Sequence, residues 1–83
     1  MAELDFLKTD YDDAITSQHA TRLELLSRHP SRYVRARVMG NPYTPLRVRD
    51  CMRQEYNNDP GLLSWLFQNP ALTRGEFVAI YQQ

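Results

Sequence analysis

The sequence predicts an all-α protein, built as a short array of about five helices. Three observations support this fold class. Apolar residues recur at helical spacing, proline-containing stops divide the chain into short segments, and one segment recurs with its cap and its stop about 28 residues later. The recurring stretch is Val34–Pro45, and its imperfect copy is Leu62–Arg74. A chain of 83 residues has room for a single domain.

Residues 1–29 are expected to form a segment that caps the N-terminal end of the array. Its first nine residues carry Leu4, Phe6 and Leu7 and form either one helical turn or an arm. Asp10 is a candidate N-cap for a helix over about 11–28, which contains neither proline nor glycine. The pattern Thr21-x-x-Glu24 resembles a capping box, so this helix is expected to break near residue 20. Its apolar stripe contains Ile15, His19, Leu23, Leu25 and Leu26.

The first repeat is expected over residues 30–57. Ser31 is a candidate N-cap for a helix over about 32–40, which Gly40 ends as a C-cap residue. The apolar face of this helix contains Val34, Val38 and Met39.

A second helix of this repeat follows the stop at Pro42. Thr44 is expected to cap it, with Pro45 at its first position. Tyr43 has the spacing of a hydrophobic staple with Val48. The apolar face of this helix contains Val48, Cys51, Met52 and Tyr56.

The second repeat is expected over residues 58–83. Asp59 is its first N-cap, followed by a proline at the first helical position, and Thr73 with Glu76 forms a capping box. The apolar residues of its two helices are Leu62, Leu63, Leu66 and Phe67, then Leu72, Phe77, Ile80 and Tyr81. Caps, stops and apolar positions recur together, which favours a true repeat.

The residues Val34-Arg35-x-x-Val38-x-x-Asn41-Pro42-x-Thr44-Pro45 resemble the signature of the leucine-rich repeat variant, which is similar in shape to the HEAT and armadillo repeats. This resemblance covers residues 30–52 well and residues 59–81 in part. It implies a right-handed superhelix (an α-solenoid) of two repeats behind the N-terminal cap. The cysteine cluster that carries an iron–sulfur centre in some proteins of this type is missing, so no cofactor is expected.

The charges are unevenly distributed, although the formal net charge is zero. Residues 1–21 carry a net charge of −4, residues 22–53 carry +6, and residues 54–83 carry −2. Eight of the nine arginines lie in the central block. This asymmetry is the strongest indication of function in the sequence, and it favours an anionic partner.

The sequence therefore predicts a non-enzymatic module that binds an acidic protein surface through the first repeat. The expected binding residues are Arg28, Arg32, Tyr33, Arg37, Arg47, Arg49, Arg53 and Trp65. Arginine, tyrosine and tryptophan are the residues that dominate protein interfaces. The competing interpretation is a solvated basic face without a specific ligand, in which Arg35 pairs with Asp50 or with an acid of the first helix.

Nucleic-acid binding through the same basic face is the alternative function. Guanidinium groups suit phosphates, but the zero net charge and the acidic N-terminal segment count against it. Neither histidine has a nucleophile placed beside it by a motif, so no catalytic site is expected. The single cysteine and the two histidines form no metal-ligand pattern. A cytoplasmic protein is expected, with no membrane partner, that is either a capped monomer or an end-to-end homodimer.

Overall fold

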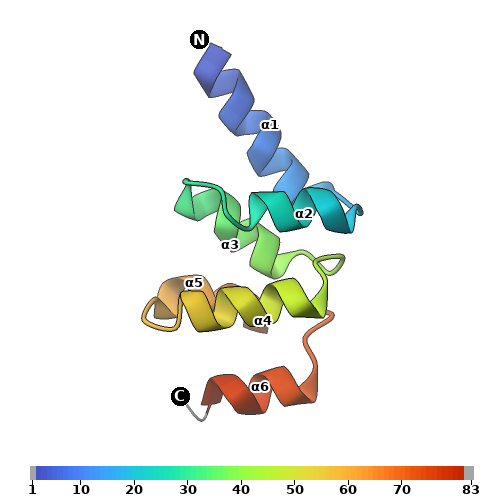
Figure 1. The fold of residues 1–83 in the computed structure, drawn as a ribbon, viewed down its shortest axis with the longest axis vertical. Coiled ribbons are helices and arrows are strands. Elements are labelled where there is room, and N and C mark those ends of the chain that lie inside the picture. Colours follow the sequence, from blue (N-terminus) through green and yellow to red (C-terminus); the bar gives the residue numbers. More distant parts are fainter. Residues whose placement is uncertain (1, 82–83) are drawn as a thin grey trace.

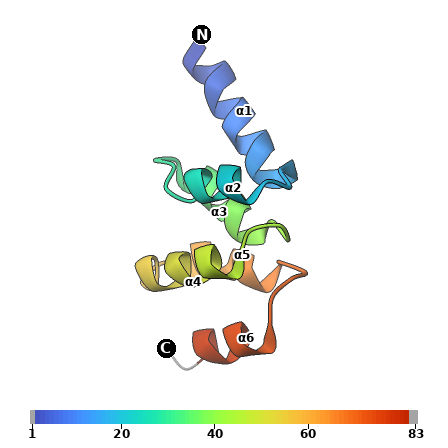
Figure 2. The same cartoon turned by 45° about the vertical axis from the view of Figure 1, so that its right-hand side comes forward.

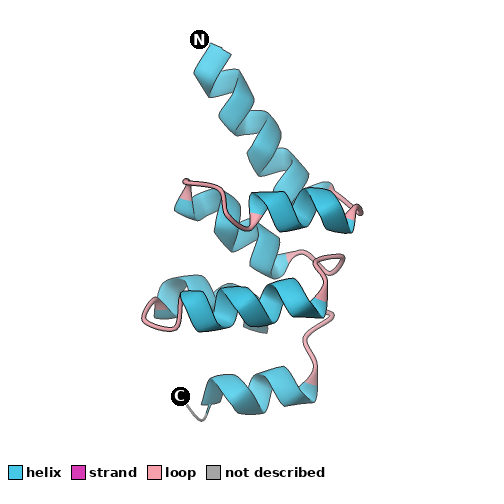
Figure 3. Cartoon of the chain, in the orientation of Figure 1, coloured by secondary structure: helices cyan, strands magenta, loops and turns pink. Residues whose placement is uncertain are grey.

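The computed structural model describes the backbone of residues 2–81 and the side chains of residues 9–79. Within that range the chain is helical and contains no strand (Figures 1 and 3), which confirms the all-α prediction. The six helices are α1 (Ala2–Thr16), α2 (Ala20–Leu26), α3 (Arg32–Gly40), α4 (Leu46–Glu55), α5 (Pro60–Phe67) and α6 (Arg74–Tyr81). One helix more than expected arises because residues 1–29 form two separate helices.

The helices lie in two columns along an elongated molecule of 43 × 24 × 17 Å. Helix α3 packs against α1 on one side and α5 on the other. Helices α2, α4 and α6 lie nearly parallel to one another in the second column, and the two ends of the chain lie at opposite ends of the long axis (Figures 1 and 2). Each column therefore contains every second helix of the chain.

The core fills the space between these helices. The predicted apolar positions of α3 and α5 are buried, with the exception of Phe67. The buried apolar residues are Ala14, Leu23, Leu26, Val34, Ala36, Val38, Met39, Val48, Met52, Leu62, Leu63 and Leu66. Tyr56 and Leu72 pack against this core from its edge, as the sequence predicts.

A buried asparagine joins α3 to α1. The amide nitrogen of Asn41 donates hydrogen bonds to the carbonyl oxygens of Ala14 (2.9 Å), Ile15 (3.3 Å) and Ser17 (3.0 Å). Its side-chain oxygen accepts the backbone N–H of Tyr43. Because the last carbonyls of a helix have no partner within that helix, Asn41 both satisfies the end of α1 and shapes the turn after α3.

Asn69 makes the equivalent contacts between α5 and α3. Its amide nitrogen donates to the carbonyl oxygens of Met39 (2.8 Å) and Asn41 (3.0 Å), and its side-chain oxygen accepts the N–H of Ala71. Both asparagines are almost completely buried. The Asn-Pro pairs of the sequence therefore end one helix and also connect it to an earlier helix.

The N-terminal segment differs from the prediction in its capping. Helix α1 begins at Ala2, so Asp10 lies within the helix and is buried rather than acting as an N-cap. The predicted break near residue 20 is confirmed, because residues 17–19 separate α1 from α2. Thr21 lies inside α2 and does not begin it. The predicted apolar stripe is also too wide, since Ile15 and Leu25 are exposed.

Ser31 occupies the N-cap position of α3 as predicted, although its side chain makes no cap hydrogen bond, whereas the predictions for the C-terminus of α3 and the start of α4 are wrong in detail. Gly40 is the last residue of α3 and has an ordinary negative φ. A Cβ on Gly40 would lie 3.2 Å from the Trp65 ring, so the glycine permits close approach of α5. The Thr44 hydroxyl donates to the Val38 carbonyl instead of capping α4, which begins one residue later than predicted with Pro45 in the N-cap position.

Several residues predicted to pack inside are exposed. Cys51 and Tyr43 are exposed, so neither a buried thiol nor a staple onto Val48 forms. The ring of Phe77 lies edge-on to that of Phe67, with 5.5 Å between the ring centroids, and both are 44% exposed.

The caps of the C-terminal helix pair are confirmed. Asp59 accepts the backbone N–H of Leu62 at 3.0 Å, and Thr73 and Glu76 exchange the two hydrogen bonds of a capping box. Predictions for the side chains of Leu4, Phe6, Leu7, Ile80 and Tyr81 lie outside the described residues.

Candidate protein-binding surface

Three of the predicted binding arginines form ion pairs with carboxylates of a neighbouring helix pair. Arg32, at the start of α3, makes a two-pronged contact with Asp59 beside α5, with N···O distances of 2.9 Å (Nε–Oδ2) and 2.8 Å (Nη2–Oδ1). This contact and the N–H of Leu62 lower the pKa of Asp59 to about 2. A paired guanidinium of this kind holds α3 to α5 and has fewer donors left for a partner.

Arg49 is the most buried of these arginines. Its Nη1 lies 3.1 Å from Oε1 of Glu76 on α6, and both side chains are almost fully buried. Neither Nε nor Nη1 of Arg49 makes a hydrogen bond in the described part of the chain. This arginine joins α4 to α6 and is inaccessible to a partner.

Arg53 lies one turn further along α4. Its side chain is mostly buried, and Nη2 lies 3.9 Å from Oδ1 of Asp50 on the same helix. The sequence placed Arg53 on an open surface, whereas the structure turns it toward the gap between α4 and α6, where both Arg53 and Asp50 line a shallow cavity.

Arg37 lies between two aromatic rings. Its guanidinium carbon is 4.4 Å from the ring centroid of Trp65 and 5.3 Å from that of Tyr11, and its Nε donates to the Tyr11 hydroxyl at 2.8 Å. Such stacking is favourable for a planar cation over an aromatic face. Arg37 and Trp65, both predicted to contact a partner, therefore contact each other and connect α1, α3 and α5.

Arg35 also has an aromatic neighbour. The sequence expected it to pair with Asp50 or with an acid of the first helix. Its guanidinium carbon instead lies 5.1 Å from the ring centroid of Tyr56, and its Nη1 donates to the His29 carbonyl at 3.4 Å.

A buried polar cluster beneath α2 was not predicted from the sequence. Asp10 accepts Nη2 of Arg22 at 2.6 Å, and it contacts Nε2 of His29 at 2.9 Å. Because the N–H of Ser31 donates to Nδ1 of His29, the ring proton lies on Nε2 and points at Asp10. Both ring nitrogens are occupied, so His29 positions helices rather than acting as a general base.

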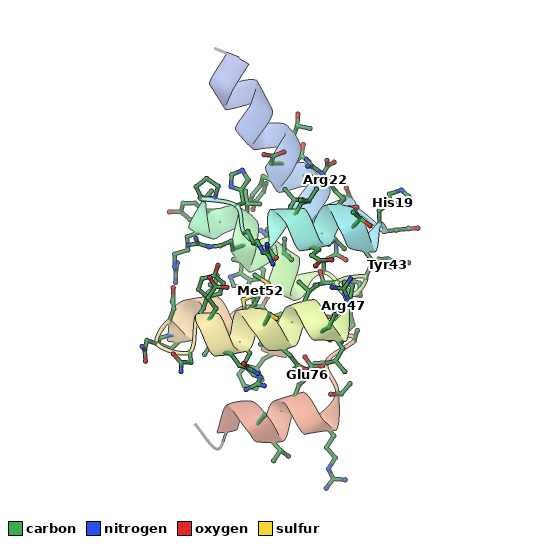
Figure 4. The ribbon with its side chains drawn as sticks, in the orientation of Figure 1. His19, Arg22, Tyr43, Arg47, Met52 and Glu76 are labelled. Carbon is green, nitrogen blue, oxygen red and sulfur yellow. The ribbon has the colours of Figure 1, made fainter. Side chains whose placement is uncertain are left out.

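An open groove lies between α2 and α4, on the face shown in Figure 4. Its floor contains the core residues Val48 and Met52, and its rim carries charged side chains from both helices. The lining residues are Glu24, Ser27, Arg28, Arg47, Val48, Cys51, Met52 and Glu55. The groove thus combines an apolar base with two of the predicted binding arginines.

The two arginines of the groove differ in their partners. Arg47 is exposed and pairs with Glu24 across the groove at 2.9 Å. That hydrogen bond lowers the pKa of Glu24, and the charge of Arg28 adds a smaller effect in the same direction. Arg28 is exposed and makes no ion pair with a described carboxylate. Arg28 is therefore the predicted binding arginine best placed to meet an external anion.

The remaining predicted residue, Tyr33, lies outside the groove. It is on the first turn of α3 and is 73% exposed, more than any other large apolar side chain that the structure describes. The structure therefore does not gather the eight predicted residues into one surface. Two line the groove, one is isolated on α3, four hold helices together, and Arg53 lies near a carboxylate of its own helix.

The sequence contains a signal that identifies these internal pairs. Arg32 and Asp59 are 27 residues apart, Arg37 and Tyr11 are 26 apart, and Asn41 and Ala14 are 27 apart. These separations are close to the spacing of the recurring segment. Residues of complementary chemistry that lie about 27 positions apart in the sequence are therefore candidates for contact.

Comparisons with known proteins give no match: neither any sequence family, nor any curated protein, nor any solved structure resembles the chain significantly. The described side chains contain no group of three potential metal ligands. Within the described range, no helix has the length and apolar character that crossing a bilayer requires.

Proposed function

We propose that the protein is a non-enzymatic binding module with the architecture of a short right-handed helical-repeat array. Residues 1–29 form its N-terminal cap, and residues 30–57 and 58–83 form two repeats. The matched roles of Asn41 and Asn69 support this architecture, since each occupies the end of one helix and binds the carbonyls that end an earlier one. A likeness to the leucine-rich repeat variant and HEAT repeats is part of the same proposal.

The partner is a protein with an acidic surface, and it docks in the groove between α2 and α4. The observation that carries this proposal is the position of Arg28, an exposed guanidinium at the rim of a groove with an apolar floor. An acidic side chain of the partner would face Arg28, while an adjacent side chain would contact the exposed Cys51 in the groove. Few residues carry most of the affinity in interfaces of this kind, and arginine is prominent among them.

Nucleic-acid binding is less well supported by the same geometry. Binding to phosphates needs several free cations along one surface. Arg32, Arg47 and Arg49 are each paired with a carboxylate, which leaves too few for a strong, salt-dependent contact. A labelled duplex that binds at low salt would reverse this preference.

The single cysteine provides a direct test, because Cys51 is exposed and lines the groove. A photo-crosslinker attached to Cys51 should capture a partner protein in an extract of the source cells. The Arg28→Glu variant should lose this adduct, while the matched Arg74→Glu variant on α6 should retain it. Adducts that are the same for all three proteins, or that form with none, would contradict the proposal.

A further inference from the structure

The C-terminal end of the molecule carries an exposed apolar patch, formed by Phe67 of α5 with Phe77 and Val78 of α6. Their exposed fractions are 44%, 44% and 42%. Since the two phenylalanine rings are in edge contact, the patch is continuous across both helices. Exposed aromatic clusters at the end of a helical array are typical of surfaces that need a covering layer.

The same positions are covered in the preceding helix pair. Met39 lies 28 residues before Phe67, and it is fully buried. Arg49 lies 29 residues before Val78, and only 5% of it is exposed because Glu76 of α6 packs on it. The positions of Phe67 and Val78 are therefore ones whose counterparts in the preceding pair are buried.

The position of Glu76 defines the direction in which Val78 points. Two residues along an α-helix correspond to a rotation of about 200°. Glu76 points toward α4 (Figure 4), so Val78 lies on the opposite side of α6, away from α4. Val78 is the α6 counterpart of Arg49 on α4, so the side of α6 that faces away from α4 carries an apolar residue where α4 carries a charged one.

The charges of α6 permit a second α6 to approach. Its only carboxylate, Glu76, is buried against Arg49, so it does not repel another copy. Its only cation, Arg74, lies in the first turn, where the helix dipole disfavours positive charge. In an antiparallel pair of α6 helices, Arg74 of each copy would lie beside the negative C-terminal end of the other helix.

We propose that a second copy of the chain covers this patch, with the two α6 helices antiparallel about a two-fold axis. An apolar patch suits such symmetry because it is complementary to itself. Three partly exposed side chains offer on the order of 200 Å² per copy, well below the ~800 Å² of a stable interface. The dimer is therefore weak and depends on concentration. This inference rests on the repeat architecture proposed above and is independent of the groove.

Sedimentation equilibrium over a concentration series reaching on the order of 1 mM tests the proposal. The native protein should shift from the mass of one chain toward that of two. Phe77→Ser combined with Val78→Ser should remain monomeric throughout. The control, Leu25→Ser, changes an apolar residue on α2 that is more exposed than the patch residues and should behave like the native protein.

A second variant separates loss of the interface from loss of folding. Arg74 is exposed, so Arg74→Glu should leave the circular dichroism spectrum unchanged and weaken the dimer by about 3- to 30-fold, since the contact occurs twice. A native protein that stays monomeric at the highest concentration would overturn the proposal. So would assembly beyond a dimer, or a dimer that is indifferent to Arg74. Arg28→Glu should dimerise normally, which distinguishes this outcome from failure of the groove.

Discussion

The two C-terminal helix pairs, α3–α4 and α5–α6, share their joints but differ in what their surfaces carry. Asn41 and Asn69 make matching contacts at the ends of α3 and α5. Four of the six arginines of α3–α4 are paired with acidic or aromatic residues outside this pair, while Arg35 and Arg53 contact Tyr56 and Asp50 within it. In α5–α6 the outward positions are apolar and exposed. An inner pair with neighbours on both sides thus uses its charges internally, while the end pair presents apolar side chains.

The largest effect is expected from a charge placed in the core of the inner pair. Val38 is fully buried in α3. Val38→Asp would bury a carboxylate without a counter-ion, which costs more than the roughly 5 kcal/mol that holds many small domains together. We expect an unfolded protein by circular dichroism. A folded variant would show that Val38 does not pack between helices.

A buried ion pair links the inner and the end pairs, and removing one of its charges should cost about 3–5 kcal/mol. Arg49→Met leaves Glu76 buried without its counter-ion. Adding Glu76→Gln keeps the acceptor that binds the N–H of Thr73 and should recover at least half of the loss. Urea unfolding of the single and double variants measures both values. A double variant no more stable than Arg49→Met would contradict a paired role.

The stack around Arg37 should contribute less, because cation–π contacts at half-buried sites are worth only about 1–2 kcal/mol. Arg37→Met keeps the packing but removes both ring contacts and the hydrogen bond to the Tyr11 hydroxyl, for an expected loss of about 1–2 kcal/mol. The fluorescence of Trp65, the only tryptophan, should change at the same time. Arg37→Lys is the control that keeps the charge without the planar group. An unchanged emission spectrum in Arg37→Met would contradict stacking on Trp65.

The smallest expected effect is a change of stability with pH at Asp59. Arg32 lowers the folded-state pKa of Asp59 from its usual 3.8 to about 2. Since the folded pKa lies below the unfolded one, the stabilisation is fully present above 3.8 and is lost as the pH falls through about 2. Asp59→Asn keeps an N-cap residue and should flatten the dependence of the urea midpoint over this range. Equal slopes for both proteins would contradict the ion pair.

The sequence predicted features whose causes are local. The capping box at Thr73, the N-cap at Asp59 and the buried face of Val34 and Val38 follow from residues within about one turn of each other. Whether an arginine is exposed or paired depends on residues about 27 positions away in the sequence, which lie on other helices. The prediction placed Arg49 on a surface because it belongs to the arginine-rich block, whereas Glu76, 27 residues later, buries it.

The groove was predicted only in part for the same reason. Arg28 and Arg47 were assigned to a binding surface on charge alone, and both lie on its rim. Cys51 was assigned to the core because its spacing from Val48 suits one helix face. It is exposed and lines the groove between α2 and α4, and this depends on how the two helices pack.

Hydrogen exchange of two matched variants tests the equivalence of the two joints most directly. In a stacked array, removing one joint should loosen the part of the chain beyond it. Asn69→Ala should accelerate exchange in α5 and α6 while α2 and α3 stay protected. Asn41→Ala should accelerate exchange in α1 and α2 while α5 stays protected. If both variants accelerate exchange evenly along the whole chain, Asn41 and Asn69 are not equivalent joints of a stacked array.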